Sequence, residues 1–392
     1  MLKNSLAPVL FIRNLYKFLM TDKCVANKRP LSRQSNFELL RIVSMFLVLI
    51  VHADFLSLGI PTDWEIINHP VSSMSRYIVQ SLALVCVNSY VLVSGYFGIH
   101  TKVKSVLRFV FMVIFWRILI NFFWLGGDIF GFVESKLTIQ HFIMLCIPGN
   151  GDWFVMAYIV LLLIAPILNS FVRNCSARKL WIYVLLYEGV QVTYSWVLHI
   201  ESGFNSGYSV LSFIGLYLVG AAICKSNILK NYRPLTLYLI LSIFAGVLVY
   251  IARRFFPHTQ ISIWVESRFD VYNSIIVILA SVFLFLYFKR LRLINSTVNK
   301  IAASSFAVYL MHMHPLIRGI YCEICKKIYY DYSNWRYLLL ISLFITGVFA
   351  IAILIDRVRL RVWRAIETTE NYRLICRNLQ SIIMDNKIPD RI

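Results

Sequence analysis

Long apolar segments, separated by short polar or basic connections, recur along almost the whole chain of 392 residues. Each apolar run extends over roughly 18–20 residues, the length with which an α-helix crosses a hydrocarbon core of about 30 Å. The roughly ten-residue alternating segments of a membrane β-barrel are absent. The pattern predicts about ten membrane-spanning helices, at about 38–58, 77–98, 106–125, 152–171, 179–198, 208–225, 235–252, 271–288, 302–320 and 337–356.

The amino-acid composition excludes an ordinary soluble protein. Hydrophobic residues make up 59% of the chain and charged residues 15%, whereas soluble domains carry about 45–50% apolar and about 25% charged residues. A soluble protein with this composition would expose large apolar surface patches and would aggregate. The predicted fold class is therefore all-α, a polytopic integral membrane protein.

The basic residues orient the predicted helices. Lysine and arginine gather in alternate connections and in both terminal segments, and they account for the formal net charge of +20. Cytoplasmic connections carry such an excess, so we expect both termini in the cytoplasm. The same bias explains the charge without nucleic acid, for which no finger-like spacing is present. The chain then divides into a basic N-terminal segment (1–35), a transmembrane domain (36–356) and a basic tail (357–392).

The cysteines give no sign of a metal site. Of the eight, only Cys322 and Cys325 are closely spaced, and a single CxxC without a second pair or a histidine pair does not form a zinc site. Two ordinary thiols are favoured, and a disulfide remains open if this connection lies outside the cell.

Two ionisable residues bracket an apolar stretch in the first predicted span. Arg41 and His52 are eleven residues apart, which places them about 20° apart around a helix and about 16 Å apart along it. Glu38, three residues before Arg41, can pair with it. An ionisable residue inside a membrane usually faces a cavity or a partner. The spacing leaves open a general base, a proton relay in a transporter, or a neutral histidine with one interhelical hydrogen bond.

The stretch "FELLRIVSMFLVLIVHADF" resembles the first helix of the acyltransferase family 3 proteins, bacterial inner-membrane O-acyltransferases of surface polysaccharides. The family pattern is an acidic residue, a basic residue three later, ten residues, and then histidine, and Glu38, Arg41 and His52 occupy these positions. Three further stretches are similar and follow in the same order: "VNSYVLVSGYFGI", "GDWFVMAYIVLLLIAPILN" and "SSFAVYLMHMHPL". The likeness covers about residues 36–320.

The resemblance implies a set of site residues. His52, Arg41 and Glu38 would be catalytic, and acetyl-CoA or another acyl-CoA would be the co-substrate, with no bound cofactor or metal. Many family members carry an Arg-x-x-Arg pair just after the Ser-Gly segment, where it is implicated in engaging the acyl donor. This chain has Lys102, Lys104 and Arg108 there, at a different spacing. The residues expected to bind the donor are Ser94, Gly95, Lys102, Lys104 and Arg108, and those expected to bind the acceptor are Trp153, Tyr158 and His312.

The function implied is transfer of acetyl from cytoplasmic acetyl-CoA to a sugar hydroxyl of an exopolysaccharide, capsule or lipopolysaccharide. The expected partners are the acyl-CoA, a glycan or lipid-linked glycan, and the bilayer of the bacterial cytoplasmic (inner) membrane, but not nucleic acid. His52 would act as a general base or would itself carry the acyl group. The alternative is a polysaccharide exporter or flippase without transferase chemistry.

Overall fold

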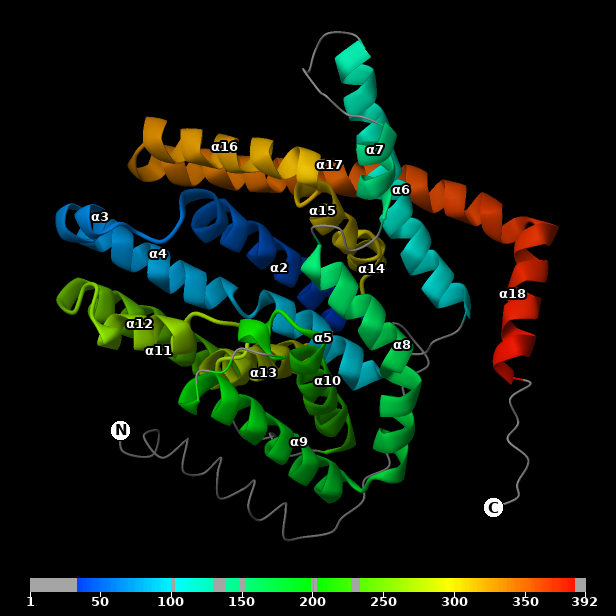
Figure 1. The fold of residues 1–392 in the computed structure, drawn as a ribbon, viewed down its shortest axis with the longest axis horizontal. Coiled ribbons are helices and arrows are strands. Elements are labelled where there is room, and N and C mark those ends of the chain that lie inside the picture. Colours follow the sequence, from blue (N-terminus) through cyan, green and yellow to red (C-terminus); the bar gives the residue numbers. More distant parts are fainter. Residues whose placement is uncertain are drawn as a thin grey trace.

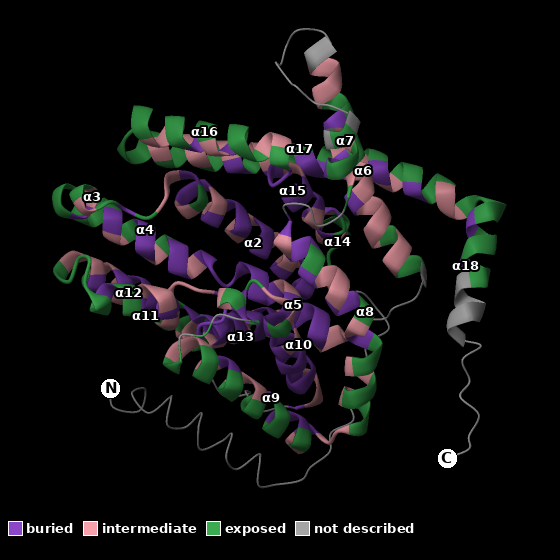
Figure 2. Cartoon of the chain, in the orientation of Figure 1, coloured by how far each residue is buried: buried purple, intermediate pink, exposed green. Residues whose placement is uncertain are grey.

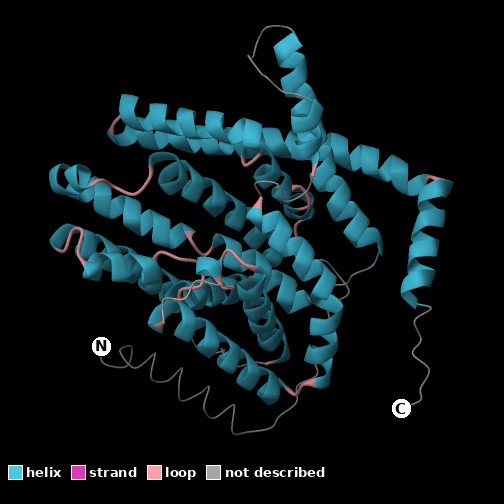
Figure 3. Ribbon diagram, in the orientation of Figure 1, coloured by secondary structure: helices cyan, strands magenta, loops and turns pink. Residues whose placement is uncertain are grey.

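A computed structural model describes residues 34–99, 103–129, 139–147, 152–198, 200, 203–226 and 233–384. Every regular element in these ranges is a helix (Figure 3), which confirms the all-α prediction. The first half of the chain contains α2 (Ser35–Val51), η1 (His52–Leu56), α3 (Asp63–Asn68), α4 (Pro70–Ala83), α5 (Cys86–Phe97), α6 (Val103–Ile129), α7 (Ile139–Cys146), α8 (Trp153–Asn174), α9 (Ala177–Val192) and η2 (Thr193–Val197). The second half contains η3 (Asn205–Gly207), α10 (Val210–Lys225), α11 (Pro234–Phe255), α12 (Gln260–Phe269), α13 (Ile275–Arg290), α14 (Ser296–Ala302), α15 (Ser305–His312), α16 (Pro315–Asp331), α17 (Asn334–Thr368) and α18 (Glu370–Met384).

Six helical segments in the described ranges are long and apolar enough to cross a membrane, and each coincides with a predicted span. A seventh apolar helix, α10, also falls where a span is predicted but is shorter. The total of about ten spans and the side on which each terminus lies stay predictions. The six segments are Ser35–Leu56, Pro70–Phe97, Lys104–Gly127, Trp153–Asn174, Pro234–Phe255 and Asn334–Thr368.

The predicted segment 302–320 is not one continuous helix. α15 ends at His312 and α16 begins at Pro315, with His314 in an extended conformation (φ −57°, ψ 135°) between them. Proline has no N–H to continue a helical ladder, and it disfavours the helical region for the residue before it. The His314 ring instead accepts a hydrogen bond from the Leu316 N–H at 3.3 Å, which caps the new helix.

The centre of the fold is the pair α5 and α10. α5 packs against α10, α2 and α13, and more than half of the residues in each of these four helices are buried (Figure 2). A Cβ atom on Gly95 would lie 2.1 Å from the Tyr217 carbonyl oxygen, and one on Gly220 would lie 2.3 Å from that of Leu92. The two backbones are therefore in direct contact, the packing that small residues permit between membrane helices.

The remaining helices surround this pair (Figure 1). α4 lies beside α11, α16 lies beside α17, and α18 turns away from the end of α17. Large apolar side chains such as Phe123, Leu163 and Leu354 are exposed on the outward faces of α6, α8 and α17. Such faces suit contact with lipid. Together with the six long apolar helices, they support the prediction of a multi-pass membrane protein.

We expect Gly95→Ala to destabilise the protein by about 1–3 kcal/mol, because the added methyl group meets backbone that has no room to move. The midpoint of heat-induced loss of the monodisperse peak in size-exclusion chromatography would measure this. Gly189→Ala is the matched control, because no atom lies within 4 Å of a Cβ at that helical position. Equal midpoints for the two variants would contradict the packing account.

Candidate functional site

The first long helix changes its winding at the predicted base. α2 is regular from Ser35 to Val51, and His52–Leu56 then form a π-helical turn. The Ser57 hydroxyl donates to the His52 carbonyl, five residues earlier, at 2.6 Å. π-helical turns are frequent at functional sites, where the extra residue per turn changes the face on which the following side chains lie. His52 is therefore the first residue of the π-helical turn, after which the side chains project from a different face of the helix.

His52 is hydrogen-bonded to His312, a contact between two residues 260 positions apart. His52 Nδ1 lies 2.8 Å from His312 Nε2, and His312 Nδ1 lies 2.6 Å from the Val308 carbonyl oxygen. A carbonyl oxygen only accepts, so His312 Nδ1 carries a proton, and in a neutral ring its Nε2 is then an acceptor. His52 Nδ1 must donate to it, which leaves the lone pair on His52 Nε2.

His52 lines a cavity of about 450 Å³. The wall is largely apolar and aromatic with a few polar groups, a composition typical of sites for organic ligands. Trp153, predicted to bind the acceptor, lies in this wall together with Tyr208 and Tyr272. The polar side chains of the wall include Gln80, Asp270 and Arg318.

The structure places His312 behind His52 and not in the cavity wall. Its side chain is 1% exposed, and both of its ring nitrogens are occupied by Val308 and His52. The Tyr321 ring packs on it at 5.2 Å between centroids. The position assigned to the acceptor by resemblance therefore lies against the predicted catalytic histidine.

Glu38 and Arg41 form the expected ion pair at the other end of α2. Arg41 Nη1 lies 3.2 and 3.3 Å from the two carboxylate oxygens. The Glu38 side chain is buried, whereas that of Arg41 is 33% exposed. The Arg41 carbonyl accepts a hydrogen bond from Tyr90 at 2.7 Å, and Tyr90 also lines the cavity. Glu38 and Arg41 are thus held near the cavity but away from His52.

Ser94 on α5 contacts Tyr158 on α8, whereas Gly95 faces α10. The Ser94 and Tyr158 hydroxyl oxygens are 3.3 Å apart, and the Tyr158 ring stacks on Phe154, a residue of the cavity wall, at 5.9 Å. Gly95 is used in the close approach of α5 to α10. The roles assigned to these three residues in binding donor and acceptor stay predictions.

The structure does not bring the predicted donor-binding cations together at one site among the residues it describes. Lys102 lies outside the described residues, and Lys104 is exposed near the start of α6. Arg108 lines a second cavity of about 290 Å³ and forms an ion pair with Glu367 at 3.0 Å.

This second cavity, which we term the basic cavity, is formed by α6, α14 and α17. Arg108, Lys300, Arg357 and Arg364 all line it. α14 begins beside the start of α2, since the Asn295 N–H donates to the Ser35 hydroxyl at 2.9 Å. The basic cavity therefore lies toward the end of α2 that carries Glu38 and Arg41.

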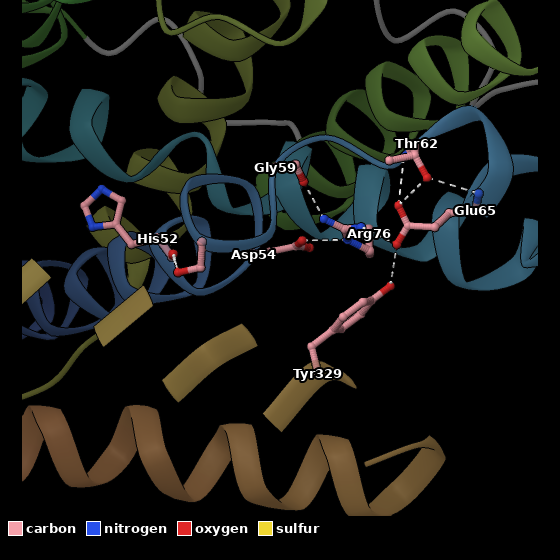
Figure 4. Close-up of polar contacts among 8 residues, drawn as sticks. His52, Asp54, Gly59, Thr62, Glu65, Arg76 and Tyr329 are labelled. Atoms are coloured by element: carbon pink, nitrogen blue, oxygen red, sulfur yellow. Dashed lines mark hydrogen bonds and ion pairs between the residues drawn. The ribbon is translucent and has the colours of Figure 1, made fainter. Parts of the chain in front are cut away.

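Arg76 joins the π-helical turn to three other elements (Figure 4). Its Nε donates to Asp54 at 2.7 Å, its Nη2 donates to the Gly59 carbonyl at 2.5 Å, and its Nη1 lies 3.5 Å from Glu65. The Tyr329 hydroxyl on α16 donates to the same Glu65 carboxylate at 3.2 Å. Asp54 lies two residues after His52, so this network holds the turn that carries the histidine.

Glu65 is a carboxylate in this network. Burial opposes its ionisation, but hydrogen bonds from the backbone and side chain of Thr62 and the charge of Arg76 outweigh burial and lower the pKa of Glu65. The Thr62 N–H donates at 2.8 Å and the Thr62 hydroxyl at 2.9 Å. The Glu65 N–H donates in turn to the Thr62 hydroxyl at 3.3 Å, and together with the Thr62 N–H contact this forms a capping box at the start of α3.

Asp270 brings an acidic group to the cavity. It follows α12, and burial above all raises its pKa to about 8. The Glu266 carboxylate raises the pKa further, a hydrogen-bonding contact with Gln80 opposes the rise, and Asp54 adds to it. At neutral pH the Asp270 carboxyl is therefore largely protonated.

Sequence reasoning did not identify Asp54, Arg76, Gln80, Asp270 or Arg318 as site residues. Asp54 had a signal, because it is a second ionisable residue inside an apolar span, two positions after His52. Arg76 lies outside the predicted spans, in the connection between 38–58 and 77–98, where a basic residue is unremarkable. The other three come from elements far apart in the sequence, and nothing in their local sequence sets them apart.

The remaining predictions concern cysteines and metals. Cys322 and Cys325 are free thiols on α16, so the disulfide left open by the sequence is not formed. Within the described ranges no three histidine, cysteine, aspartate or glutamate side chains gather as metal ligands would.

We expect Arg76→Met to destabilise the protein by about 3–5 kcal/mol, because it leaves Asp54 buried without its partner. The thermal unfolding midpoint in detergent would measure the loss. The double variant Asp54→Asn with Arg76→Met should recover part of it, since no unpaired charge remains. Arg292→Gln, at an exposed position, is the control. A wild-type midpoint for Arg76→Met would refute the role of the network.

Asp270 predicts a pH dependence of stability. Its pKa of about 8 in the folded protein exceeds the value of about 3.9 in an unfolded chain. The folded state binds more protons in this window, so the contribution to stability is fully present below about pH 4 and is lost as pH rises through about 8. The thermal midpoint of the wild type should fall relative to that of Asp270→Asn between about pH 5 and pH 8.5. A constant difference would contradict the raised pKa.

The chain was compared with known proteins. The profile of acyltransferase family 3, described as an acyltransferase domain, matches residues 34–357. That range contains the histidine pair, the Arg76 network and every residue that lines the cavity of about 450 Å³. No curated protein and no solved structure matches the chain. Because the profile covers most of the chain, the protein belongs to acyltransferase family 3.

Proposed function

We propose that the protein is a membrane O-acyltransferase that moves an acetyl group from acetyl-CoA to a hydroxyl of a surface glycan. The observation that carries the proposal is the hydrogen-bonded chain from Val308 through His312 to His52, which leaves a lone pair on His52 Nε2. Family membership supplies acyl transfer as the reaction class. The donor and the acceptor follow from the sequence resemblance.

The role proposed for His52 is that of a general base. A sugar hydroxyl is a poor nucleophile at neutral pH, and His52 Nε2 takes its proton as the oxygen bonds to the thioester carbonyl carbon. The C–S bond then breaks, and the proton passes from His52 to the departing thiolate. The products are the sugar ester and free CoA, and His52 returns to its starting state.

Two further side chains support this step. His312 Nε2 accepts from His52 Nδ1–H, so it orients the His52 ring and stabilises the imidazolium that forms during transfer. Arg318 lines the cavity with His52. A cation there stabilises the oxyanion that develops on the thioester carbonyl.

The basic cavity is the proposed site for the donor phosphates. Arg108, Lys300, Arg357 and Arg364 converge there, and guanidinium groups bind phosphate through paired hydrogen bonds. The cavity lies toward the start of α2, and His52 is about 25 Å farther along that helix. The long pantetheine arm of CoA suits such a separation between phosphates and thioester.

We expect His52→Ala to reduce acetyl transfer at least about 100-fold, because no other group replaces the base. His312→Ala should reduce it by about tenfold, because the base remains but its tautomer and orientation are no longer fixed. Release of CoA by the full-length protein in nanodiscs, together with NMR of O-acetyl groups on the surface glycan, measures both effects.

His69→Ala is the matched control, because His69 is an exposed histidine outside the cavity wall. Its activity should equal that of the wild type. Normal glycan acetylation by a correctly inserted His52→Ala variant would contradict the proposal. Glycan retained inside the cell, with its acetylation intact, would favour export instead.

A further inference from the structure

Two polar side chains of the cavity have no part in the proposed chemistry. Gln80 on α4 and Asp270 after α12 both line the cavity with His52, and they contact each other. Gln80 is 6% exposed. The Gln80 Oε1 and Asp270 Oδ1 atoms are buried and have no hydrogen-bond partner among the residues that the structure describes.

These two oxygens need hydrogen-bond partners. Buried polar atoms in native proteins are nearly always paired, and an unpaired buried oxygen stays costly until a partner reaches it. The Asp270 carboxyl is largely protonated at neutral pH, so it does not offer the full negative charge that would select an ammonium group. A ligand rich in hydroxyl groups satisfies such a pair, because each hydroxyl both donates and accepts.

An aromatic surface lies in the same cavity. The Trp153 and Tyr208 rings are 4.6 Å apart between centroids, and those of Tyr208 and Tyr272 are 5.0 Å apart. Trp153 begins α8 and Tyr208 precedes α10, while Tyr272 follows Asp270 by two residues. Large, rigid aromatic rings of this kind present apolar faces to a ligand and keep a polar edge for hydrogen bonding.

We infer that Gln80 and Asp270 form the hydroxyl-recognition pair for the acceptor, a neutral pyranose ring that packs on Trp153, Tyr208 and Tyr272. The pair holds ring hydroxyls that are not acylated, and another hydroxyl of the same ring is presented to His52. This inference rests on the proposed function, because it names residues that select the acceptor of that reaction. Neither residue belongs to the sites predicted from the sequence.

The test uses the full-length protein in nanodiscs with acetyl-CoA and a set of p-nitrophenyl pyranosides that comprises the gluco, galacto, manno and 2-amino-2-deoxygluco forms. Mass spectrometry gives the acylated pyranoside, and total CoA release gives all turnover. Their ratio reports how acyl groups divide between sugar and water, and it does not depend on the amount of folded protein. Gln80→Met and Asp270→Asn should each lower this ratio at least tenfold.

The chain offers a matched pair of control positions. Gln191 and Glu188 on α9 are also a buried amide and carboxyl in contact, with Gln191 Nε2 donating to Glu188 at 3.1 Å. Their remaining oxygens are likewise unpaired within the described ranges, and neither residue lines the cavity. Gln191→Met and Glu188→Gln should leave the ratio within twofold of the wild type.

Three outcomes would overturn the inference. One is a ratio within twofold of the wild type for both Gln80→Met and Asp270→Asn. Another is a wild type that releases CoA but acylates none of the pyranosides. The third is a loss confined to 2-amino-2-deoxy pyranosides, which would assign the pair to an ammonium group. His52→Ala separates this inference from the proposed function, because unchanged CoA release in that variant would refute the function itself.

Discussion

A carbonyl oxygen accepts hydrogen bonds and never donates one, and at Val308 this constraint determines the functional centre. It fixes the proton on His312 Nδ1, and through His312 it fixes the tautomer of His52. Val308 and His312 lie one turn apart on α15, so the geometry depends on how α15 is held against α2. Tyr321 contributes to that placement, since its hydroxyl donates to the Leu49 carbonyl at 2.8 Å, just before His52. The packing of α15 against α2 therefore determines which nitrogen of His52 carries the proton.

The second constraint is the placement of buried charge on the other side of the π-helical turn. Asp54 and Arg76 are both buried, and such a pair contributes little net stability once the loss of hydration is counted. The pair instead positions the π-helical turn, because Arg76 also contacts Gly59 and Glu65. The turn is thereby held from one side by the Arg76 network and from the other by the His312 contact.

Much of the fold and part of the site are predictable from the sequence. The apolar pattern identifies the long helices because hydropathy and the length of an apolar run are properties of local sequence. The Glu38–Arg41 pair follows from spacing along one helix, and it is present. The His52–His312 contact joins residues 260 positions apart, and no periodicity predicts which helices meet. The division at Pro315 has a local signal, because a proline is expected to kink or end a helix. Gln80 and Asp270 become neighbours only because α4 and α12 both pack on α11.

α17 has a length that matters beyond the site. Its 35 residues extend over about 52 Å, whereas the hydrocarbon core of a bilayer is about 30 Å thick. Its arginine-rich end and the turn into α18 (Figure 1) therefore project well beyond the hydrocarbon. This bent end of the molecule, in which α18 packs on α6 and α17, is a feature on which particle images can be aligned. It makes the chain a better subject for electron cryo-microscopy than its size alone would indicate.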